Sequence, residues 1–148
     1  MVIIREALEK DIPRILELYR QLSFEPEKHP TPPLNECRKV FREMSQYPGY
    51  TLLVAEDNGQ VVGTTVLAVL PGFAHGTSPF AVVEYVVVDE KCRSKGIGKL
   101  LMESVKSLAK EARCYKIMLT SDVRRERAHK FYKSLGFEPS AQGFRFYF

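Results

Sequence analysis

The chain has 148 residues, 45% of them hydrophobic and 27% charged, which predicts a single globular domain over residues 1–148. Its 22 Lys and Arg against 18 Asp and Glu leave a net charge of +4, too small an excess to indicate a non-specific nucleic-acid-binding protein. Three cysteines without CxxC spacing argue against a disulfide framework and against a structural zinc site. The sequence contains no apolar run long enough to span a membrane and no signal-peptide core, so we expect a cytoplasmic protein.

The N-terminal half predicts a strand, two helices and a hairpin. Apolar residues recur at helical spacing in two segments, and residues 23–33 between them hold four of the nine prolines, which predicts a loop. Asp57-Asn58-Gly59 is typical of a hairpin turn. The expected elements are a strand at Val2–Arg5, helices at 12–22 and 34–47, and hairpin strands at Tyr50–Glu56 and Gln60–Leu70.

The C-terminal half alternates strands with helices. Phe80–Val88 is apolar except for Glu84, as expected for a central strand buried on both faces. A long amphipathic helix begins at Ile97. The later elements expected are a strand at Tyr115–Thr120, a helix at Glu126–Leu135 and a strand at Phe144–Phe148. The whole order predicts an α/β (α+β) domain of three layers, with a mixed central sheet of about six to seven strands flanked by four helices.

The segment that joins the apolar strand to the long helix has the features of an anion-binding loop. A helix N-terminus presents unpaired backbone N–H groups and about half a positive charge. Gly96 and Gly98 allow the backbone to approach a ligand closely, so the segment suits a pyrophosphate. Three basic residues add charge: Arg93, Lys95 and Lys99. The alternative is that the glycines only shape a tight connection.

Two common phosphate-binding motifs do not fit this loop. A Walker loop needs Gly where the chain has Arg93, and Ser or Thr where it has Leu100. A dinucleotide-binding fingerprint needs Gly or Ala where the chain has Leu101. Both motifs are therefore excluded.

A third motif does fit. Arg93-x-x-Gly96-x-Gly98 resembles the acetyl-CoA pyrophosphate loop of the GNAT superfamily of N-acetyltransferases. Ala128–Phe137 (AHKFYKSLGF) resembles the family segment ending A-x-x-F-Y-x-x-x-G-F, and Arg5-Glu6-Ala7 resembles the family's N-terminus. The resemblance spans the chain and is strongest over residues 82–138. It implies a GNAT-like domain, acetyl-CoA as co-substrate, and direct acetyl transfer to a primary amine in a ternary complex.

The resemblance also implies a set of cofactor-binding residues. A strand bulge would present a backbone N–H group to the developing oxyanion. Arg125 stands where many family members carry an Asn that contacts the pantetheine arm or a bound water, so it either reaches a phosphate or faces solvent. The implied residues are Val86, Val87, Val88, Arg93, Ser94, Lys95, Gly96, Ile97, Gly98, Lys99 and Arg125.

Two side chains are candidates for catalysis. A protonated amine has no lone pair, so a base assists the transfer. Glu84 is expected to be buried with a raised pKa, and its position resembles that of a carboxylate base in some family members. The alternative is a structural Glu paired with a basic residue. By the resemblance, Tyr132 donates a proton to the departing CoA thiolate; the alternative is a tyrosine that only packs.

The acceptor amine stays open at this point. The run Val86–Val88 together with Cys114–Ile117 is similar to glucosamine-phosphate acetyltransferases, whereas Val123–Tyr132 and the aromatic tail are similar to aminoalkylphosphonate acetyltransferases. A small amine metabolite is expected. The alternatives are N-terminal or lysine acetylation of proteins and a non-catalytic CoA-binding module. No metal, nucleic-acid or membrane partner is expected, and the tail Phe144–Phe148 suits a homodimer contact.

Overall fold

The computed structural model describes residues 1–148 and divides into two compact units, Met1–Met118 and Leu119–Phe148. The first unit contains a five-stranded sheet and three of the four α-helices. The second contains the fourth α-helix, and the rest of it has no helix or strand.

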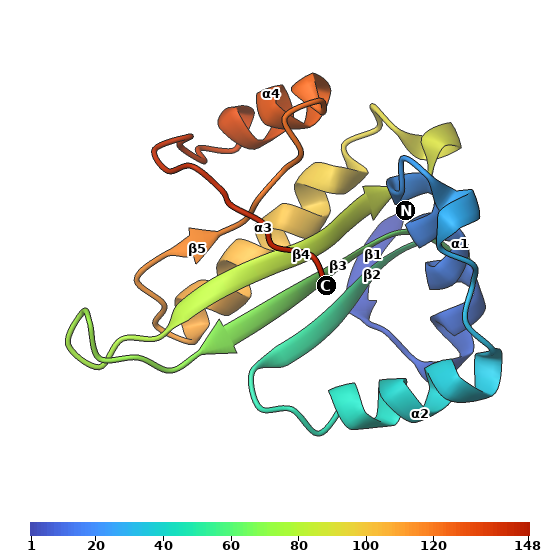
Figure 1. Cartoon of the computed structure of the whole chain (residues 1–148), viewed down its shortest axis with the longest axis horizontal. Helices are drawn as coiled ribbons and strands as arrows, with labels where there is room; N and C mark the ends of the chain where they lie inside the picture. The colour runs from blue at the N-terminus through green and yellow to red at the C-terminus, as the bar shows by residue number, and fades with distance from the viewer. The chain divides into compact units, whose positions relative to one another are not determined.

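The sheet has the strand order β1-β2-β3-β4-β5 (Figure 1). The first four strands pair antiparallel, and β5 pairs parallel to β4. The turn between β2 and β3 has positive φ angles at Asn58 (49°) and Gly59 (79°), as the favoured two-residue hairpin turn requires. The strands are β1 (Val2–Glu6), β2 (Tyr50–Asp57), β3 (Gln60–Leu70), β4 (Phe80–Val88) and β5 (Ile117–Met118).

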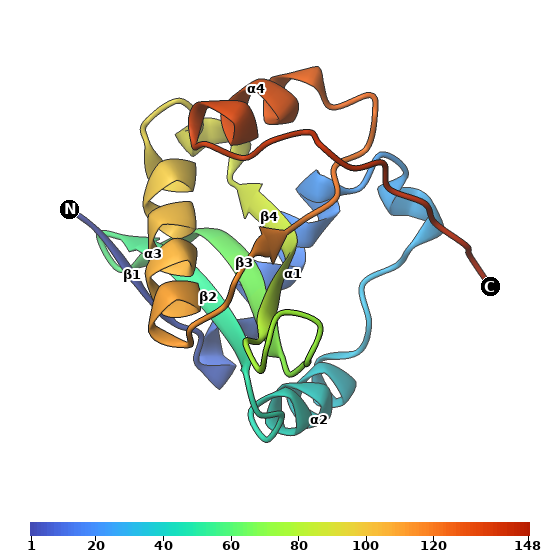
Figure 2. The same cartoon turned by 90° about the vertical axis from the view of Figure 1, so that its left-hand side faces the viewer.

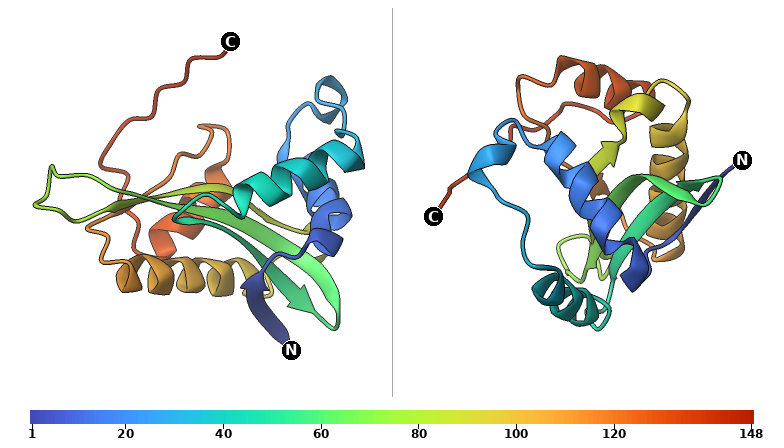
Figure 3. Two further views of the ribbon diagram at one scale, coloured as in Figure 1. Left: turned by 90° about the horizontal axis from the view of Figure 1, so that it is seen from below. Right: turned by 90° about the vertical axis from the view of Figure 1, so that its right-hand side faces the viewer.

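Helices cover both faces of this sheet. The helices α1 (Ile12–Leu22) and α2 (Leu34–Met44) lie on one side, and α3 (Ile97–Glu111) lies on the other (Figures 2 and 3). On the α1 side the buried cluster consists of Ile15, Leu18, Val54, Val61 and Val87. On the α3 side the fully buried residues of the helix are Leu101, Met102 and Val105. The α+β class and its three layers are confirmed.

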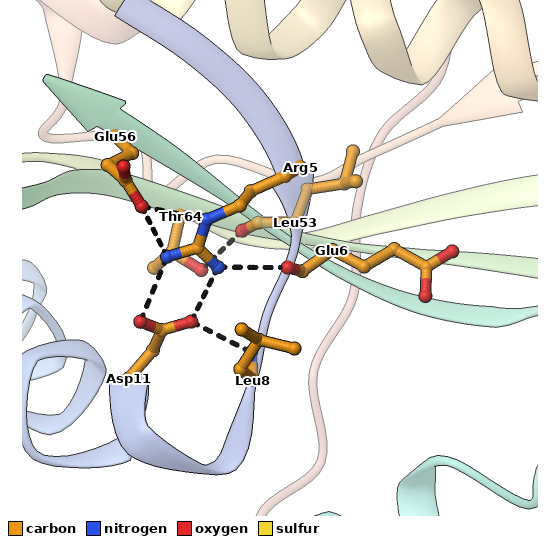
Figure 4. A network of polar contacts seen from close by, with 7 residues as sticks. All are labelled: Arg5, Glu6, Leu8, Asp11, Leu53, Glu56 and Thr64. Carbon is orange, nitrogen blue, oxygen red and sulfur yellow. Dashed lines mark hydrogen bonds and ion pairs between the residues drawn. The ribbon is translucent and has the colours of Figure 1, made fainter. Parts of the chain in front are cut away.

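An ion-pair network holds β1 to its neighbours at the N-terminal edge of the sheet (Figure 4). The Arg5 guanidinium donates to both carboxylate oxygens of Asp11, at 2.7 and 3.1 Å, and to Glu56 on β2, at 2.6 and 2.8 Å. Asp11 also accepts the backbone N–H of Leu8 at 2.8 Å and is only 6% exposed. The network therefore gives the Asp11 carboxylate the hydrogen-bond partners without which its burial would cost free energy.

The second unit is built around α4 (Glu126–Ser134). The helix ends as predicted, with Gly136 in the left-handed region at φ 89° and the N–H of Phe137 donating to the carbonyl oxygen of Tyr132 at 3.1 Å. Asp122 joins the segment before α4 to the C-terminal tail, because it accepts hydrogen bonds from both Arg124 and Arg145.

Two strand predictions are wrong. The sheet has five strands and not six to seven, because Phe144–Phe148 forms no strand and pairs with nothing in the sheet. A strand needs a hydrogen-bonding neighbour, and an alternating aromatic pattern does not supply one. The strand expected at Tyr115–Thr120 is reduced to Ile117–Met118, since only these two residues pair with β4.

Candidate functional site

The strand β4 carries a bulge in its second half. Thr64 on β3 faces Val87, and Val66 faces Glu84, so the single residue Thr65 stands opposite two residues of β4. These two are Tyr85 and Val86, and Tyr85 has a φ of +56°, which is uncommon for a residue other than glycine. A bulge leaves its extra residue out of the ladder and re-aims the strand. The strand that carries Val86, Val87 and Val88 therefore has a bulge, as the family resemblance implies.

The opposite edge of β4 is open beside this bulge. The strand β5 pairs with β4 only at Ala81 and Val82 (Figure 1). From Val83 to Val88, β4 has no strand neighbour on that side in the first unit. Of the three valines implied by the family resemblance, Val87 is buried, and Val86 and Val88 are partly exposed at this edge.

Glu84 lies directly before the bulge and is exposed. The expectation of a carboxylate buried on a strand covered on both faces is therefore wrong. The reason is local: the bulge changes the alternation of side chains, so that Glu84 and Tyr85 are both exposed, Tyr85 by 50%.

Three tyrosines lie near one another, and one of them, Tyr50, also lies near Glu84; sequence reasoning missed this cluster. The ring centroids of Tyr19 on α1 and Tyr85 on β4 are 5.4 Å apart. Burial, and then the nearby Tyr50 and Tyr85, raise the pKa of Tyr19. Burial also raises the pKa of Tyr50, with smaller contributions from Tyr85 and Glu84. These tyrosines are far apart in sequence, so the spacing of aromatic residues along the chain could not predict the cluster.

The loop after β4 leads from a short 3-10 helix, Glu90–Cys92, to the start of α3. Ser94 (φ 62°) and Gly96 (φ 79°) both take left-handed conformations, which turn the chain sharply into the helix. Arg93 bonds back to the carbonyl oxygen of Val88 at 3.1 Å through its Nε. The first helical hydrogen bond runs from the N–H of Leu100 to the carbonyl oxygen of Gly96. The N–H groups of the first turn thus lie at the positive end of the α3 helix dipole.

The predicted anion-binding residues are together at this helix start. Arg93, Ser94, Lys95, Gly96 and Lys99 are exposed, whereas Ile97 is 2% exposed and anchors the helix in the core. A Cβ atom added at Gly96 would meet no atom within 4 Å, so the space above this residue is open. The loop therefore combines an accessible backbone with basic side chains, which is what a pyrophosphate requires.

Tyr132 and Arg125 belong to the second unit. Arg125 precedes α4, and Tyr132 lies inside it, with its ring against Phe131 (centroids 5.2 Å apart) and Phe137 (5.9 Å). His129 lies one turn before Tyr132 and its Nε2 is 2.9 Å from the carbonyl oxygen of Asp122. Hydrogen bonds from the Arg124 side chain and backbone, and from Arg145, hold the pKa of Asp122 well below its usual range.

The structure contains no group of three or more His, Cys, Asp or Glu side chains placed to hold a metal ion. Its helices are all too short or too polar to cross a lipid bilayer. His75, a loop histidine, stacks on Tyr115 with ring centroids 4.0 Å apart.

The sequence profile described as "Acetyltransferase (GNAT) family" matches residues 12–137. The chain is 34% identical over 82 residues to a glucosamine 6-phosphate N-acetyltransferase of Trypanosoma brucei brucei, covering 55% of this chain and 54% of that protein. It is 33% identical over 99 residues to a probable glucosamine 6-phosphate N-acetyltransferase of Drosophila melanogaster, covering 66% and 44%. The chain thus spans about half the length of these two relatives.

A solved structure is similar over almost the whole chain. It is a putative acetyltransferase from Agrobacterium tumefaciens str. C58, with a TM-score of 0.91 and 34% identity, and the match covers 98% of this chain and 99% of the other.

Proposed function

The chain belongs to the acetyltransferase (GNAT) family, and we propose that residues 1–148 act as one N-acetyltransferase domain that transfers the acetyl group of acetyl-CoA to a primary amine. The observation that carries this proposal is the arrangement of β4. Its bulge and its open edge lie directly before a basic loop at the N-terminus of a 15-residue helix. An oxyanion donor and a pyrophosphate site therefore follow one another along one stretch of chain.

The loop binds the pyrophosphate in this proposal. The backbone N–H groups at the start of α3 donate to phosphate oxygens, and the exposed side chains of Arg93, Lys95 and Lys99 supply the charge. The open edge of β4 at Val86–Val88 offers backbone groups to the pantetheine arm. In the second unit, Arg125 binds the same co-substrate in place of the Asn that many relatives carry there.

The transfer itself needs three contributions. The neutral amine nitrogen attacks the thioester carbonyl carbon, the C–S bond breaks, and the amine proton and the thiolate must both be accommodated. Glu84 accepts or relays the amine proton; as an exposed carboxylate beside the bulge, it is open to a substrate or a water. A backbone N–H group at the bulge donates to the developing oxyanion, and the Tyr132 hydroxyl donates to the departing sulfur.

The acceptor in this proposal is a small amine metabolite. Glucosamine 6-phosphate is the first compound to test, since the two relatives named above carry it in their names.

The exposed aromatic tail Phe144–Phe148 suits a homodimer contact, with Phe144 86% and Phe146 83% exposed.

Thermal unfolding with acetyl-CoA tests the co-substrate site. A ligand that binds only the folded state stabilises it and so raises the transition temperature. At a concentration 100 times its Kd, the free energy of unfolding rises by about 2.7 kcal/mol. We expect acetyl-CoA and CoA at about 1 mM to raise the Tm by several degrees, and adenosine or acetate to leave it unchanged. No shift with either CoA compound would contradict the proposal.

A further inference from the structure

The 3-10 helix Glu90–Cys92, which directly precedes the loop Arg93–Lys99, is fixed to the rest of the first unit by a buried carboxylate. Asp89 is 6% exposed and accepts the backbone N–H of Lys91 at 2.9 Å. Its own N–H donates to the carbonyl oxygen of Val62 on β3 at 2.8 Å, and its carbonyl oxygen accepts the N–H of Cys92 at 2.8 Å. Every polar group of Asp89 thus sets the direction in which the chain leaves β4.

The partner of this carboxylate comes from α1. Arg14 forms an ion pair with Asp89 through its Nη2, and its Nε donates to the carbonyl oxygen of Val61 at 2.9 Å. Its Nη1 pairs with Glu17 at 2.7 Å. One guanidinium therefore joins α1, the start of β3 and the first residue after β4. Such a planar group bonded on three sides has one orientation.

A second residue of α1 repeats the arrangement two turns later. Gln21 accepts the N–H of Glu90 at 2.9 Å through its Oε1. Residues seven apart lie on one face of a helix, so Arg14 and Gln21 approach the loop from the same side. Together they account for the N–H groups of Glu90 and Lys91: Gln21 directly, and Arg14 through Asp89.

The exposed part of the loop lies between two fixed points. Arg93, Ser94, Lys95 and Gly96 are all exposed, and the next buried residue is Ile97 in the core. Arg93 bonds to the carbonyl oxygen of Val88, close to where the chain leaves β4. The way in which the 3-10 helix is fixed at its start therefore contributes to the direction of the N–H groups that follow.

We infer that Arg14 and Gln21 are positioning residues for acetyl-CoA binding: they touch no ligand, but they fix the loop Arg93–Lys99 in the orientation that receives the pyrophosphate. This inference rests on the proposed function. Hydrogen bonds have narrow ranges of distance and angle, so a small shift of the donor N–H groups weakens their bonds to a phosphate. Loss of either contact therefore weakens acetyl-CoA binding without touching the amine site.

The chain offers a matched control for the ion pair. Arg5–Asp11 joins an arginine and a nearly buried carboxylate much as Arg14–Asp89 does, with side-chain exposures of 23% and 6% against 33% and 9%. It lies at the edge of the sheet around β1 and has no contact with the loop. Arg5→Gln thus reproduces the loss of stability without the proposed loss of positioning.

The experiment measures the acetyl-CoA Kd by calorimetry, and then kcat and both KM values, for Arg14→Gln, Arg14→Lys, Gln21→Ala and Arg5→Gln. We expect the acetyl-CoA Kd and KM to rise about tenfold in Arg14→Gln and by a smaller factor in Gln21→Ala. Arg14→Lys, which keeps the charge opposite Asp89, should recover part of the affinity. In all variants kcat and the amine KM should stay within about twofold of the wild type, and Arg5→Gln should lose stability but no affinity.

Two outcomes overturn the inference in distinguishable ways. If wild type binds acetyl-CoA, and folded Arg14→Gln and Gln21→Ala bind it equally well, the inference fails and the proposed function stands. If wild type does not bind acetyl-CoA, the proposed function fails and the inference with it. Gln21→Ala keeps the test valid should Arg14→Gln not fold, because the Gln21 contact is exposed and its loss leaves the Glu90 N–H to water.

Discussion

Thr65 on β3 donates a hydrogen bond from its Oγ1 to the carbonyl oxygen of Glu84 on β4, at 3.2 Å. Thr65 is fully buried and is the single residue opposite the two-residue bulge. The bond therefore fixes the backbone at the point where β4 departs from regular pairing. It connects the fold to the proposed chemistry, in which a backbone N–H group at the bulge donates to the oxyanion.

Replacement of the Thr65 hydroxyl should lower both the free energy of unfolding and kcat. Thr65→Val removes the donor and should cost about 1 kcal/mol of unfolding free energy and lower kcat, because the bulge loses its fixed geometry. Thr64→Val is the control, as Thr64 is equally buried and donates to the carbonyl oxygen of Leu53 on β2 at 2.7 Å, away from β4. Urea unfolding and steady-state kinetics measure both effects. Equal turnover in the two variants would show that the Thr65 bond serves stability alone.

The exposed carboxylate should matter for turnover and not for folding. Glu84→Gln should lower kcat at pH 7 by about 100-fold and leave the Tm and the acetyl-CoA Kd unchanged, because a surface substitution changes stability little. Glu111→Gln, at the far end of α3, is the control. A pH–rate profile of both variants checks the role. If Glu84→Gln keeps the wild-type rate and profile, another group accepts the proton.

The basic residues at the start of α3 should bind anions as a group. Lys95→Gln combined with Lys99→Gln should weaken acetyl-CoA binding by about tenfold at low salt, and the difference should shrink as salt screens the charges. Lys106→Gln with Lys110→Gln removes the same charge from the other end of the helix and should change the Kd by less than about twofold. Calorimetry at two salt concentrations measures the acetyl-CoA Kd of both double variants. Equal losses in both pairs would indicate a general charge effect and no local site.

The hydroxyl of Tyr132 should act only in the chemical step. Tyr132→Phe should lower kcat by about 100-fold and keep the acetyl-CoA Kd, because the ring contacts with Phe131 and Phe137 remain. Tyr147→Phe is the control, since that hydroxyl lies 3.4 Å from Arg145 on the tail. Thiol release under saturating substrates gives kcat. Unchanged turnover in Tyr132→Phe would assign the tyrosine to packing.

Acid should weaken the fold through its paired carboxylates. Burial opposes the ionisation of Asp11, but hydrogen bonds from Arg5 and the Leu8 N–H outweigh it and leave the pKa of Asp11 below its usual range. A pKa lowered in the folded state adds stability above the unfolded value of about 4, and that stability is lost as the pH falls through the folded pKa. The urea midpoint should thus hold between pH 7 and 5 and fall below about pH 4.

The variant Asp11→Asn assigns part of this fall to one group. It should be less stable than wild type at pH 7 and should lose less on acidification. Urea unfolding at several pH values makes the comparison. Parallel curves for wild type and variant would place the acid sensitivity elsewhere.

The sequence was informative wherever the determinants of structure are local. Helical spacing and a two-residue turn at Asn58 and Gly59 predicted α1, α3 and the β2–β3 hairpin closely, because each depends on near neighbours in the chain. The loop Arg93–Lys99 was found in the same way, as its glycines and charges are consecutive.

The remaining features depend on residues far apart. Tyr85 has a φ of +56°, but no glycine in the sequence indicates a left-handed conformation there. The bulge depends on how β4 pairs with β3. Arg14 and Asp89 are 75 residues apart, so their ion pair follows from the folded arrangement of α1 and β4. The tail Phe144–Phe148 shows the opposite error: its alternation is typical of a strand, but the sheet provides no partner.

The most direct test of the account is release of CoA thiol by the wild-type protein with acetyl-CoA and a panel of primary amines, including glucosamine 6-phosphate, with the product identified by mass. We expect at least one small amine to gain one acetyl group, with one thiol released for each acetyl transferred. If acetyl-CoA binds but no amine in the panel, peptide amines included, is acetylated above the rate without protein, the account of an acetyltransferase is contradicted and a CoA-binding module takes its place.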